Sequence, residues 1–276
     1  MGLRIATNVP SMNAQRNLSV TSEKQANTLN KLSSGQRITK AGDDAAGLAI
    51  SEKLKGSIRS LQQANRNASD GVSMIQTAEG GINEVSNILL RLRELSVQAA
   101  SDTVGDVERG FSNKEFQALK TEVDRISQTT NFNGHALLNG SGDSYDFQVG
   151  INNSPELDRM KYDTRETDVT AGTLGISDTA VHSKEAAQEN LGKLDIAIQK
   201  VNENRAGLGA LQNRLTSTSN NLSVMTENLA AANSRIRDAD MANETSELTK
   251  QSILAQAGTA VLAQANSSGN QALKLL

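Results

Sequence analysis

Cysteine and tryptophan are absent from the 276 residues, and aromatic side chains make up only 2% of them. Without cysteine the chain has no disulfides, no thiolate metal ligands and no cysteine nucleophile. The absence fits an oxidising compartment and a reducing one equally well. The scarcity of aromatic residues argues against a large compact core, because these side chains each bury a large area. Leu, Ile, Val and Ala fill the apolar positions instead, which favours thin seams between helices.

A strong net charge and a long apolar run are missing too. The net charge is only -3, so general nucleic-acid binding has no electrostatic support. No segment has the length and apolarity to span a bilayer, which predicts no membrane insertion. The opening residues, MGLRIATNVPSMNAQRN, lack the continuous apolar stretch of a secretory signal. Protein surfaces are therefore the expected partners, and export requires a route without signal cleavage.

Proline occurs only at positions 10 and 155, which leaves residues 11–154 free of the strongest helix breaker. Apolar residues then recur at heptad spacing, at Leu54, Ile58, Leu61, Ala68, Val72, Ile75, Ile82 and Leu89. This pattern predicts a helix of about 55 residues, roughly 80 Å long, capped by Asp43 or Asp44 and ending near Asp102. A second stripe overlaps its end, at Val85, Ile88, Leu92, Leu95 and Ala99. The contact face of this helix is expected to widen near residue 85.

The remaining chain repeats the helical pattern around one β-like excursion. A shorter helix with Phe116 and Val123 on its apolar face is expected to stop at the turn of residues 131–134. Residues 137–178 are predicted as strands and turns, and as the only β-like region, because apolar and polar residues alternate there. A second long heptad run follows Ser183, at Ala187, Leu191, Leu194, Ile198, Val201, Leu208, Leu215, Leu222, Leu229 and Ile236.

Two long seams of similar length flanking a small excursion are expected to fold back antiparallel. The predicted fold class is mainly α, an elongated antiparallel long-helix bundle or coiled coil with a small β-hairpin-rich excursion. The predicted organisation is an N-terminal arm (1–42), a long and a short helix (43–136), the β/turn region (137–178), a C-terminal long helix (179–236) and a C-terminal arm (237–276).

The two arms are too sparsely apolar to fold alone. Residues 1–40 carry six positive charges and one negative charge, whereas residues 237–276 carry three positive and four negative. This asymmetry favours pairing of the arms with each other. Their apolar residues also lack sufficient cover within the chain, so we expect them at contacts between subunits. The predicted interface residues are Ile5, Val9, Met12, Leu29, Leu32, Ile253, Leu254, Val261, Leu262, Leu273, Leu275 and Leu276.

Candidate catalytic, metal-binding and phosphate-binding residues occur in this sequence without the neighbouring residues that such sites require. His135 and His182 are isolated from each other and from any metal-ligand spacing. Gly207 and Gly209 lie inside a heptad run, not between a strand and a helix as in a phosphate loop. Asp43 and Asp44 fit a helix cap better than an acid/base pair. We therefore expect no enzyme activity, no metal and no cofactor.

The run LSSGQRITKAGDDAAGLAIS at residues 32–51 closely resembles the N-terminal signature of bacterial flagellins. Further blocks follow in the family's order: LRIATN near the start, RLRELSVQAAS at 91–101, TTNFNG at 129–134, and the long C-terminal run at 235–266. The likeness covers nearly the whole chain. Because the central insert is so short, the resemblance implies a short flagellin that lacks large outer variable domains.

This resemblance implies a non-enzymatic subunit that self-assembles into the extracellular flagellar filament used for swimming. It implies unfolded export through the flagellar type III apparatus, and terminal arms that become ordered on polymerisation. The implied partners are other flagellin subunits, an export chaperone at the C-terminal arm, the export apparatus, and the cap and junction proteins. Two alternatives remain: a hook-filament junction protein, which shares the arms, and a cytoplasmic coiled-coil scaffold or signalling module, which heptads alone permit.

Arg91, Leu95 and Glu115 align with the flagellin surface recognised by the animal Toll-like receptor for flagellin. The resemblance therefore implies innate immune recognition at these residues. Leu90 and Leu119 stand where relatives commonly carry polar residues. The alternative role for the same three residues is contact between neighbouring subunits or a solvated helix face.

Overall fold

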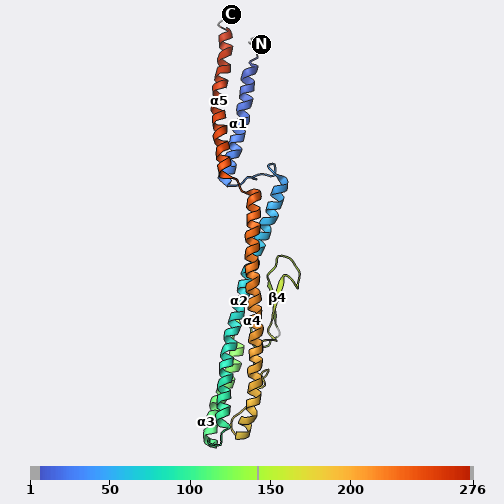
Figure 1. Cartoon of the computed structure of the whole chain (residues 1–276), viewed down its shortest axis with the longest axis vertical. Coiled ribbons are helices and arrows are strands. Elements are labelled where there is room, and N and C mark those ends of the chain that lie inside the picture. Colours follow the sequence, from blue (N-terminus) through green and yellow to red (C-terminus); the bar gives the residue numbers. More distant parts are fainter. Residues whose placement is uncertain (1–6, 142, 274–276) are drawn as a thin grey trace. The chain divides into compact units, whose positions relative to one another are not determined.

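The computed structural model describes residues 7–141 and 143–273, with side chains described as far as Ser267. Its elements, in chain order (Figure 1), are α1 (Val9–Ser34), α2 (Ala45–Ala99), α3 (Asp106–Thr129), β1 (Asn131–Phe132), β2 (His135–Ala136), β3 (Ser144–Gln148), β4 (Arg159–Asp163), α4 (Lys184–Arg237) and α5 (Met241–Leu273). The chain divides into a terminal unit, Met1–Ile58 with Glu227–Leu276, and a central unit, Arg59–Thr226. None of the described helices combines the length and the apolar character that a membrane span requires.

In the central unit, α2 and α4 lie side by side and run in opposite directions (Figure 1). Asn65 of α2 hydrogen-bonds Ser219 and Ser223 of α4, at 2.5 Å and 3.0 Å. Further along α2, Arg93 Nε donates to Asp195 Oδ1 at 2.6 Å. Residue numbers rise on one helix as they fall on the other, so the antiparallel prediction is confirmed.

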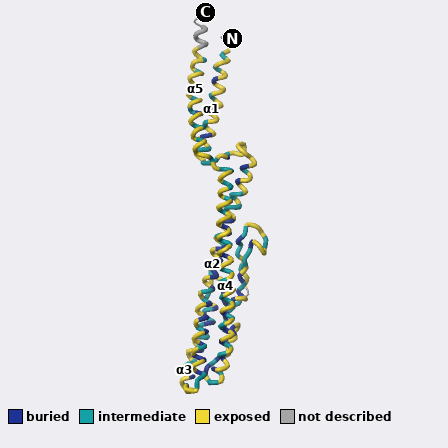
Figure 2. Tube along the Cα trace, in the orientation of Figure 1, coloured by how far each residue is buried: buried dark blue, intermediate teal, exposed yellow. Residues whose placement is uncertain are grey.

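The core of the central unit combines buried residues of the two long helices with buried residues of α3 and of the segment between α3 and α4, and buried residues are drawn dark blue in Figure 2. Those from α2 include Leu61, Ala68, Ile75, Ile82 and Leu89, and those from α4 include Ala187, Leu194, Val201, Leu208 and Leu215. α3 adds Phe116 and Val123, both fully buried. Full burial of a large aliphatic side chain contributes about 1.5–3 kcal/mol. Aliphatic seams with a single buried phenylalanine thus replace an aromatic core, as the composition predicted.

Two antiparallel hairpins lie between α3 and α4. β1 pairs with β2 through Phe132 and His135, and β3 pairs with β4 over the five residues of each strand, with Tyr145 opposite Tyr162. The prediction that β structure is confined to residues 137–178 is therefore wrong. An Asn-Gly pair that joins two extended residues forms a hairpin, and the expected turn of residues 131–134 is the centre of one.

Gly81 explains how the segment after α3 packs closely on α2. A Cβ atom at this position would lie 2.7 Å from Leu138 Cδ1 and 2.7 Å from Thr130 Oγ1. Leu138 is fully buried there. Glycine inside a helix costs roughly 0.5–1 kcal/mol relative to alanine. This cost is offset by the close approach that it allows.

In the terminal unit, α1 and α5 pair antiparallel. Asn8 Nδ2 donates to Ala265 O at 2.9 Å, Gln25 Nε2 donates to Ser252 Oγ at 3.2 Å, and Lys31 Nζ lies 3.8 Å from Glu244 Oε1. The predicted pairing of the arms is confirmed. The less exposed residues form a seam of mostly small or polar side chains: Ser11, Ala14, Leu18, Thr21, Gln25, Thr28 and Leu32 on α1, and Glu244, Leu248, Gln251, Ala255, Gly258, Leu262 and Ala265 on α5.

The two linkers of the terminal unit, 35–44 and 238–240, are bound together near the end of α4. Arg37 N donates to Arg237 O at 2.6 Å, and Arg37 Nη2 donates to Ile236 O at 2.7 Å. Arg237 Nε donates in return to Gln36 Oε1 at 3.0 Å, and its guanidinium forms an ion pair with Glu52 at the start of α2. The first turns of α2 and the last turns of α4 therefore belong to the terminal unit, whose boundaries fall inside these helices.

Candidate assembly and recognition surfaces

The outer faces of α1 and α5 carry six of the twelve predicted interface residues. Val9, Met12, Leu29, Ile253, Leu254 and Val261 are between 47% and 62% exposed, in contrast to the seam. Val20 and Met241 are similarly exposed and were not predicted. We call these eight residues the outer apolar set. Figure 2 shows that exposed residues cover most of both helices.

The other predicted interface residues have different positions. Leu32 and Leu262 lie partly buried on the seam between α1 and α5. Leu273 ends α5, but its side chain is not described, and Ile5, Leu275 and Leu276 lie outside the described residues. The arm residues therefore serve two surfaces, one within the chain and one facing outward.

Arg91 and Glu115 form one ion-pair cluster that joins α2 to α3. Arg91 Nε donates to Glu115 Oε1 at 2.9 Å, and Arg91 Nη1 donates to Glu94 Oε2 at 3.0 Å. The hydrogen bonds to Glu94 and then Glu115 raise the pKa of the Arg91 guanidinium above its usual value. All three side chains are exposed, so this cluster forms a charged surface that a partner can reach.

Leu95 does not belong to that surface. Its side chain is only 2% exposed and lies in the core of the central unit. The expectation that Leu95 forms part of a recognition surface is therefore wrong. Leu95 belongs to the second apolar stripe of α2, which faces the core of the bundle. Leu90 and Val97 are exposed instead, and with Arg93, Glu94 and Gln98 they line a shallow hollow.

Arg109 is a structurally important residue that sequence reasoning missed. It is 7% exposed, and it donates through Nε to Ala99 O at 2.9 Å and through Nη2 to Ser101 O at 3.0 Å. These carbonyls lie at and just beyond the C-terminal end of α2. A cation there also interacts favourably with the helix dipole. α2 thus ends at Ala99 instead of near Asp102, where the periodicity placed its end.

The two aspartates before α2 have separate structural roles. Asp44 Oδ1 accepts from Gly47 N at 2.8 Å, which confirms the predicted helix cap. Asp43 Oδ2 accepts from Lys40 N and Thr39 N, each at 3.0 Å, and from the Thr39 hydroxyl at 2.9 Å. These bonds, that from Lys40 first, lower the pKa of Asp43 below its usual value. Each carboxylate is engaged with neighbouring backbone.

The two histidines have different surroundings. The His135 ring lies 5.2 Å from the Tyr145 ring, edge to face, and His182 is exposed just before α4. Gly207 and Gly209 lie within α4, as predicted. Across residues 7–141 and 143–273, no cluster of three or more His, Asp or Glu side chains is placed to hold a metal ion.

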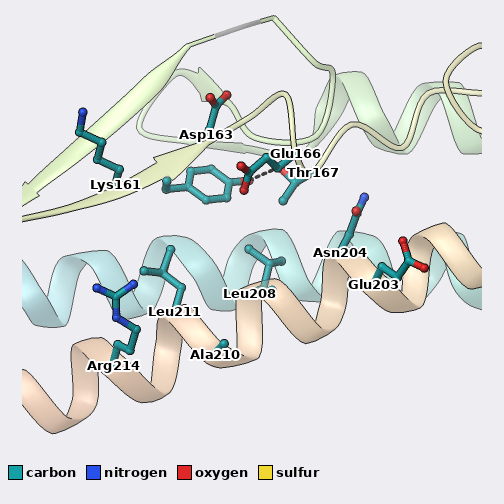
Figure 3. Close-up of a pocket in the computed structure, with 12 residues that line it drawn as sticks. Lys161, Asp163, Glu166, Thr167, Glu203, Asn204, Leu208, Ala210, Leu211 and Arg214 are labelled. Carbon is teal, nitrogen blue, oxygen red and sulfur yellow. Dashed lines mark hydrogen bonds between the residues drawn. The ribbon is translucent and has the colours of Figure 1, made fainter.

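A groove of about 340 Å³ lies between β4 and α4 (Figure 3), and no predicted site residue lines it. Tyr162, Leu208 and Leu211 line its apolar floor, although Tyr162 and Leu208 are almost fully buried, and Asp163 and Glu166 add acidic groups. The Tyr162 hydroxyl donates to Leu137 O at 2.7 Å and lies 2.8 Å from Thr167 Oγ1. Burial raises the pKa of Tyr162 to about 12. In Figure 3, Lys161 and Arg214 lie toward one end of the groove and Glu203 toward the other.

Comparison with known proteins agrees with the fold and with the motifs. The family model of the bacterial flagellin N-terminal helical region matches residues 5–143, and that of the C-terminal helical region matches residues 191–276. The flagellin of Halalkalibacterium halodurans is 46% identical, over 98% of this chain and 98% of its own length.

Two solved structures resemble the chain. The crystal structure of Bacillus cereus flagellin has a TM-score of 0.51 and 33% identity, and the match covers 61% of this chain and 94% of that one. A putative flagellar hook-associated protein from Vibrio parahaemolyticus has a TM-score of 0.58 over 71% of this chain and 100% of that one, but its 13% identity shows a shared fold alone. The two family matches and the full-length identity thus show that the chain belongs to the bacterial flagellin family.

Proposed function

We propose that this flagellin joins its neighbours in the extracellular flagellar filament through the outer apolar set of α1 and α5. The family establishes the chain as a structural filament subunit that self-assembles. The outer apolar set is the surface proposed to make the contacts of this self-assembly. The arms are proposed to become ordered as that surface is covered.

The observation that carries the proposal is an inverted distribution of side chains in the α1–α5 pair. The seam inside the chain consists mostly of small or polar residues, whereas larger apolar residues such as Met12 and Ile253 point outward. A helix pair that served only itself would have the opposite arrangement. Covering the exposed half of each outer residue contributes roughly 1 kcal/mol, half the value for full burial. Across eight residues this is a sizeable driving force for association.

The same distribution supports ordering of the arms on assembly. Fixing each backbone residue costs about 1–2 kcal/mol in conformational entropy. The seam contains few large apolar side chains to offset that cost, so the free arms are proposed to be marginal. Contacts that use a different surface on each partner continue from copy to copy, and they build a helical array where the rotation between copies does not close a ring.

Seeded polymerisation of the purified full chain tests the proposal. Replacing Ile253 and Val261 together with glutamine removes two members of the outer apolar set while keeping good helix formers. The expected result is a strong loss of filament mass in sedimentation and electron microscopy, with the central unit still folded by circular dichroism. Ser246→Gln, on the exposed face of the same helix, is the matched control. Normal polymerisation of the double variant would contradict the proposal.

The alternatives predict different behaviour in the same assays. A hook-filament junction protein would not extend into long filaments by itself. A cytoplasmic scaffold or signalling module would be missing from filaments sheared from the cell surface. The full-length identity to a flagellin favours the filament subunit over both.

We also propose partners that act during export, the first of them a chaperone. Leu254 and Val261 of α5 are exposed apolar residues that need cover before assembly, which supports docking of an export chaperone on the C-terminal arm. The absence of cysteine suits passage of an unfolded chain through the type III export apparatus. The cap and junction proteins are the remaining proposed partners. Binding of a chaperone to the full chain, reduced by Leu254→Gln, is the measurement.

Recognition by a host Toll-like receptor is proposed for the surface around Arg91 and Glu115. Both side chains are exposed and held in a defined geometry by their ion pair. A cell reporter that carries the receptor is expected to respond to the monomer and to respond less to Arg91→Ala. Arg125→Ala is the matched control, because Arg125 is an exposed arginine paired with Glu122 elsewhere on α3. A reporter that stays silent with the intact monomer would refute this role.

A further inference from the structure

All of the sulfur in this chain is in thioethers, because the sequence has six methionines and no cysteine. Where a cysteine thiolate is present, it is a strong nucleophile toward peroxides. Without one, the methionine thioethers are the side chains that a peroxide oxidises first. The exposure of each thioether then decides which methionines react.

The described methionines differ widely in exposure. Met12 of α1 is 62% exposed, Met241 at the start of α5 is 51% exposed, and Met225 of α4 is 44% exposed. Met74 is only 6% exposed, and Met160 is partly buried against the core of the central unit. A dilute oxidant is therefore expected to reach the first three sulfurs well before the other two.

Two of the three exposed methionines belong to the outer apolar set. Met12 belongs to α1 and Met241 to α5, so each arm contributes one. Met225 lies in the central unit and is not a member of the set. Methionine is a flexible apolar side chain that adapts to irregular gaps at binding surfaces. The reactive sulfurs thus lie on the surface that a neighbouring subunit is proposed to cover.

We propose that Met12 and Met241 are oxidation sites at which a hydroperoxide switches off the assembly of this flagellin. The thioether sulfur attacks the terminal oxygen of the peroxide, and an S–O bond forms as the O–O bond breaks. The second oxygen leaves with the proton as water or an alcohol, so the sulfur is oxidised by two electrons and the peroxide is reduced. This switch rests on the proposed function and adds a condition under which the outer apolar set stops binding.

A sulfoxide changes the chemistry of the surface that must be covered. Burying its polar oxygen without a hydrogen-bond donor costs free energy, whereas burying the thioether stabilises the contact. Every subunit carries both sites, so each added subunit loses both contributions. Oxidation at both sites is expected to raise the critical concentration at least about tenfold, equivalent to about 1.4 kcal/mol. The switch acts on free subunits, because sulfurs that are covered in a filament are shielded from the oxidant.

Oxidation of the purified full chain before seeded polymerisation tests this switch. Dilute hydrogen peroxide is the oxidant, peptide mass spectrometry verifies the sulfoxides, and sedimentation gives the critical concentration. Met12→Leu/Met241→Leu keeps side chains of similar volume but removes both sulfurs, so this leucine pair is expected to polymerise normally before and after treatment. Met225→Leu, which removes an exposed sulfur outside the outer apolar set, is the matched control and is expected to stay sensitive.

The outcomes separate the switch from the proposed function. Loss of polymerisation in the oxidised chain, with protection in the leucine pair, supports the switch. Normal polymerisation of a chain that carries both sulfoxides, or an equal loss in the leucine pair, overturns it. The proposed function is judged separately by the Ile253→Gln/Val261→Gln variant, whose normal polymerisation overturns that function whatever oxidation does.

Enzymatic repair tests the switch without any substitution, and it decides the matter if the untreated leucine pair does not polymerise. Methionine sulfoxide reductases return each sulfoxide epimer to the thioether. Their action on the oxidised chain is expected to bring the critical concentration back to within about twofold of the untreated value. A chain that regains both thioethers but still does not polymerise would overturn the switch.

Discussion

Replacing Arg109 with methionine tests what ends α2 and joins it to α3. Methionine keeps much of the apolar stem but removes the guanidinium, which donates to Ala99 O and Ser101 O. A hydrogen bond to a charged group contributes about 1.5–3 kcal/mol net. Ala99 is fully buried, so its carbonyl cannot turn to water in exchange. The ion pair with Asp106 adds little, because that carboxylate is 90% exposed.

The two carbonyl bonds together, less the desolvation of the guanidinium that methionine avoids, predict a loss of about 3 kcal/mol in the free energy of unfolding. With a urea dependence of about 1–3 kcal/mol per molar, the unfolding midpoint is expected to fall by roughly 1–3 M. Circular dichroism of the full chain measures it. Arg125→Met on the same helix is the control and is expected to lose less than about 1 kcal/mol. A loss below about 1 kcal/mol at Arg109 would refute the reasoning.

Further predictions concern the core and the hydroxyl of Tyr162. Leu194→Ala is expected to cost about 2–5 kcal/mol in urea unfolding, whereas Ile196→Ala, two positions along and 67% exposed, is expected to cost far less. Gly81→Val is expected to cost about 1–3 kcal/mol by the same measurement, because its side chain would overlap Leu138. Because the pKa of Tyr162 is raised to about 12, its stabilising effect is complete below about pH 10 and is lost as pH rises through 12, by roughly 3 kcal/mol. Tyr162→Phe loses about 1 kcal/mol at neutral pH but escapes that alkaline loss, so the order of stability is expected to reverse between about pH 10 and 12, and no reversal would contradict the assignment.

The long helices were predictable because their heptads contain enough repeats to outweigh local exceptions. The second stripe of α2 even includes Leu95 among the apolar positions that face the bundle. Periodicity was therefore a better guide to the burial of this residue than the likeness to a recognition surface. The hairpin of β1 and β2 was missed because two residues per strand are too few to show an alternating pattern.

The remaining features depend on distant residues and leave no local pattern. Arg109 has the sequence neighbours of an ordinary surface arginine, and only the fold brings it to the carbonyl of Ala99. Lys161 of β4 and Arg214 of α4 line the groove from two elements that are distant in the sequence, so no spacing in the sequence predicts the groove. For the two arms, the sequence showed which residues are apolar, but it did not predict which of them face the seam and which face outward.

The α1–α5 seam has a consequence for how the two ends of the chain recognise each other. Leu18 packs over Gly258, where a Cβ atom would lie 3.3 Å from Leu18 Cδ1, but few other large side chains set the alignment. Ser11 and Gln25 find their side-chain partners across the seam, Asn266 and Ser252, only in one register. Hydrogen-bond partners therefore align α1 with α5 more than large apolar side chains do. A chimaera that takes α1 from one relative and α5 from another is therefore expected to misalign first where those amide partners differ, even if its apolar residues are kept.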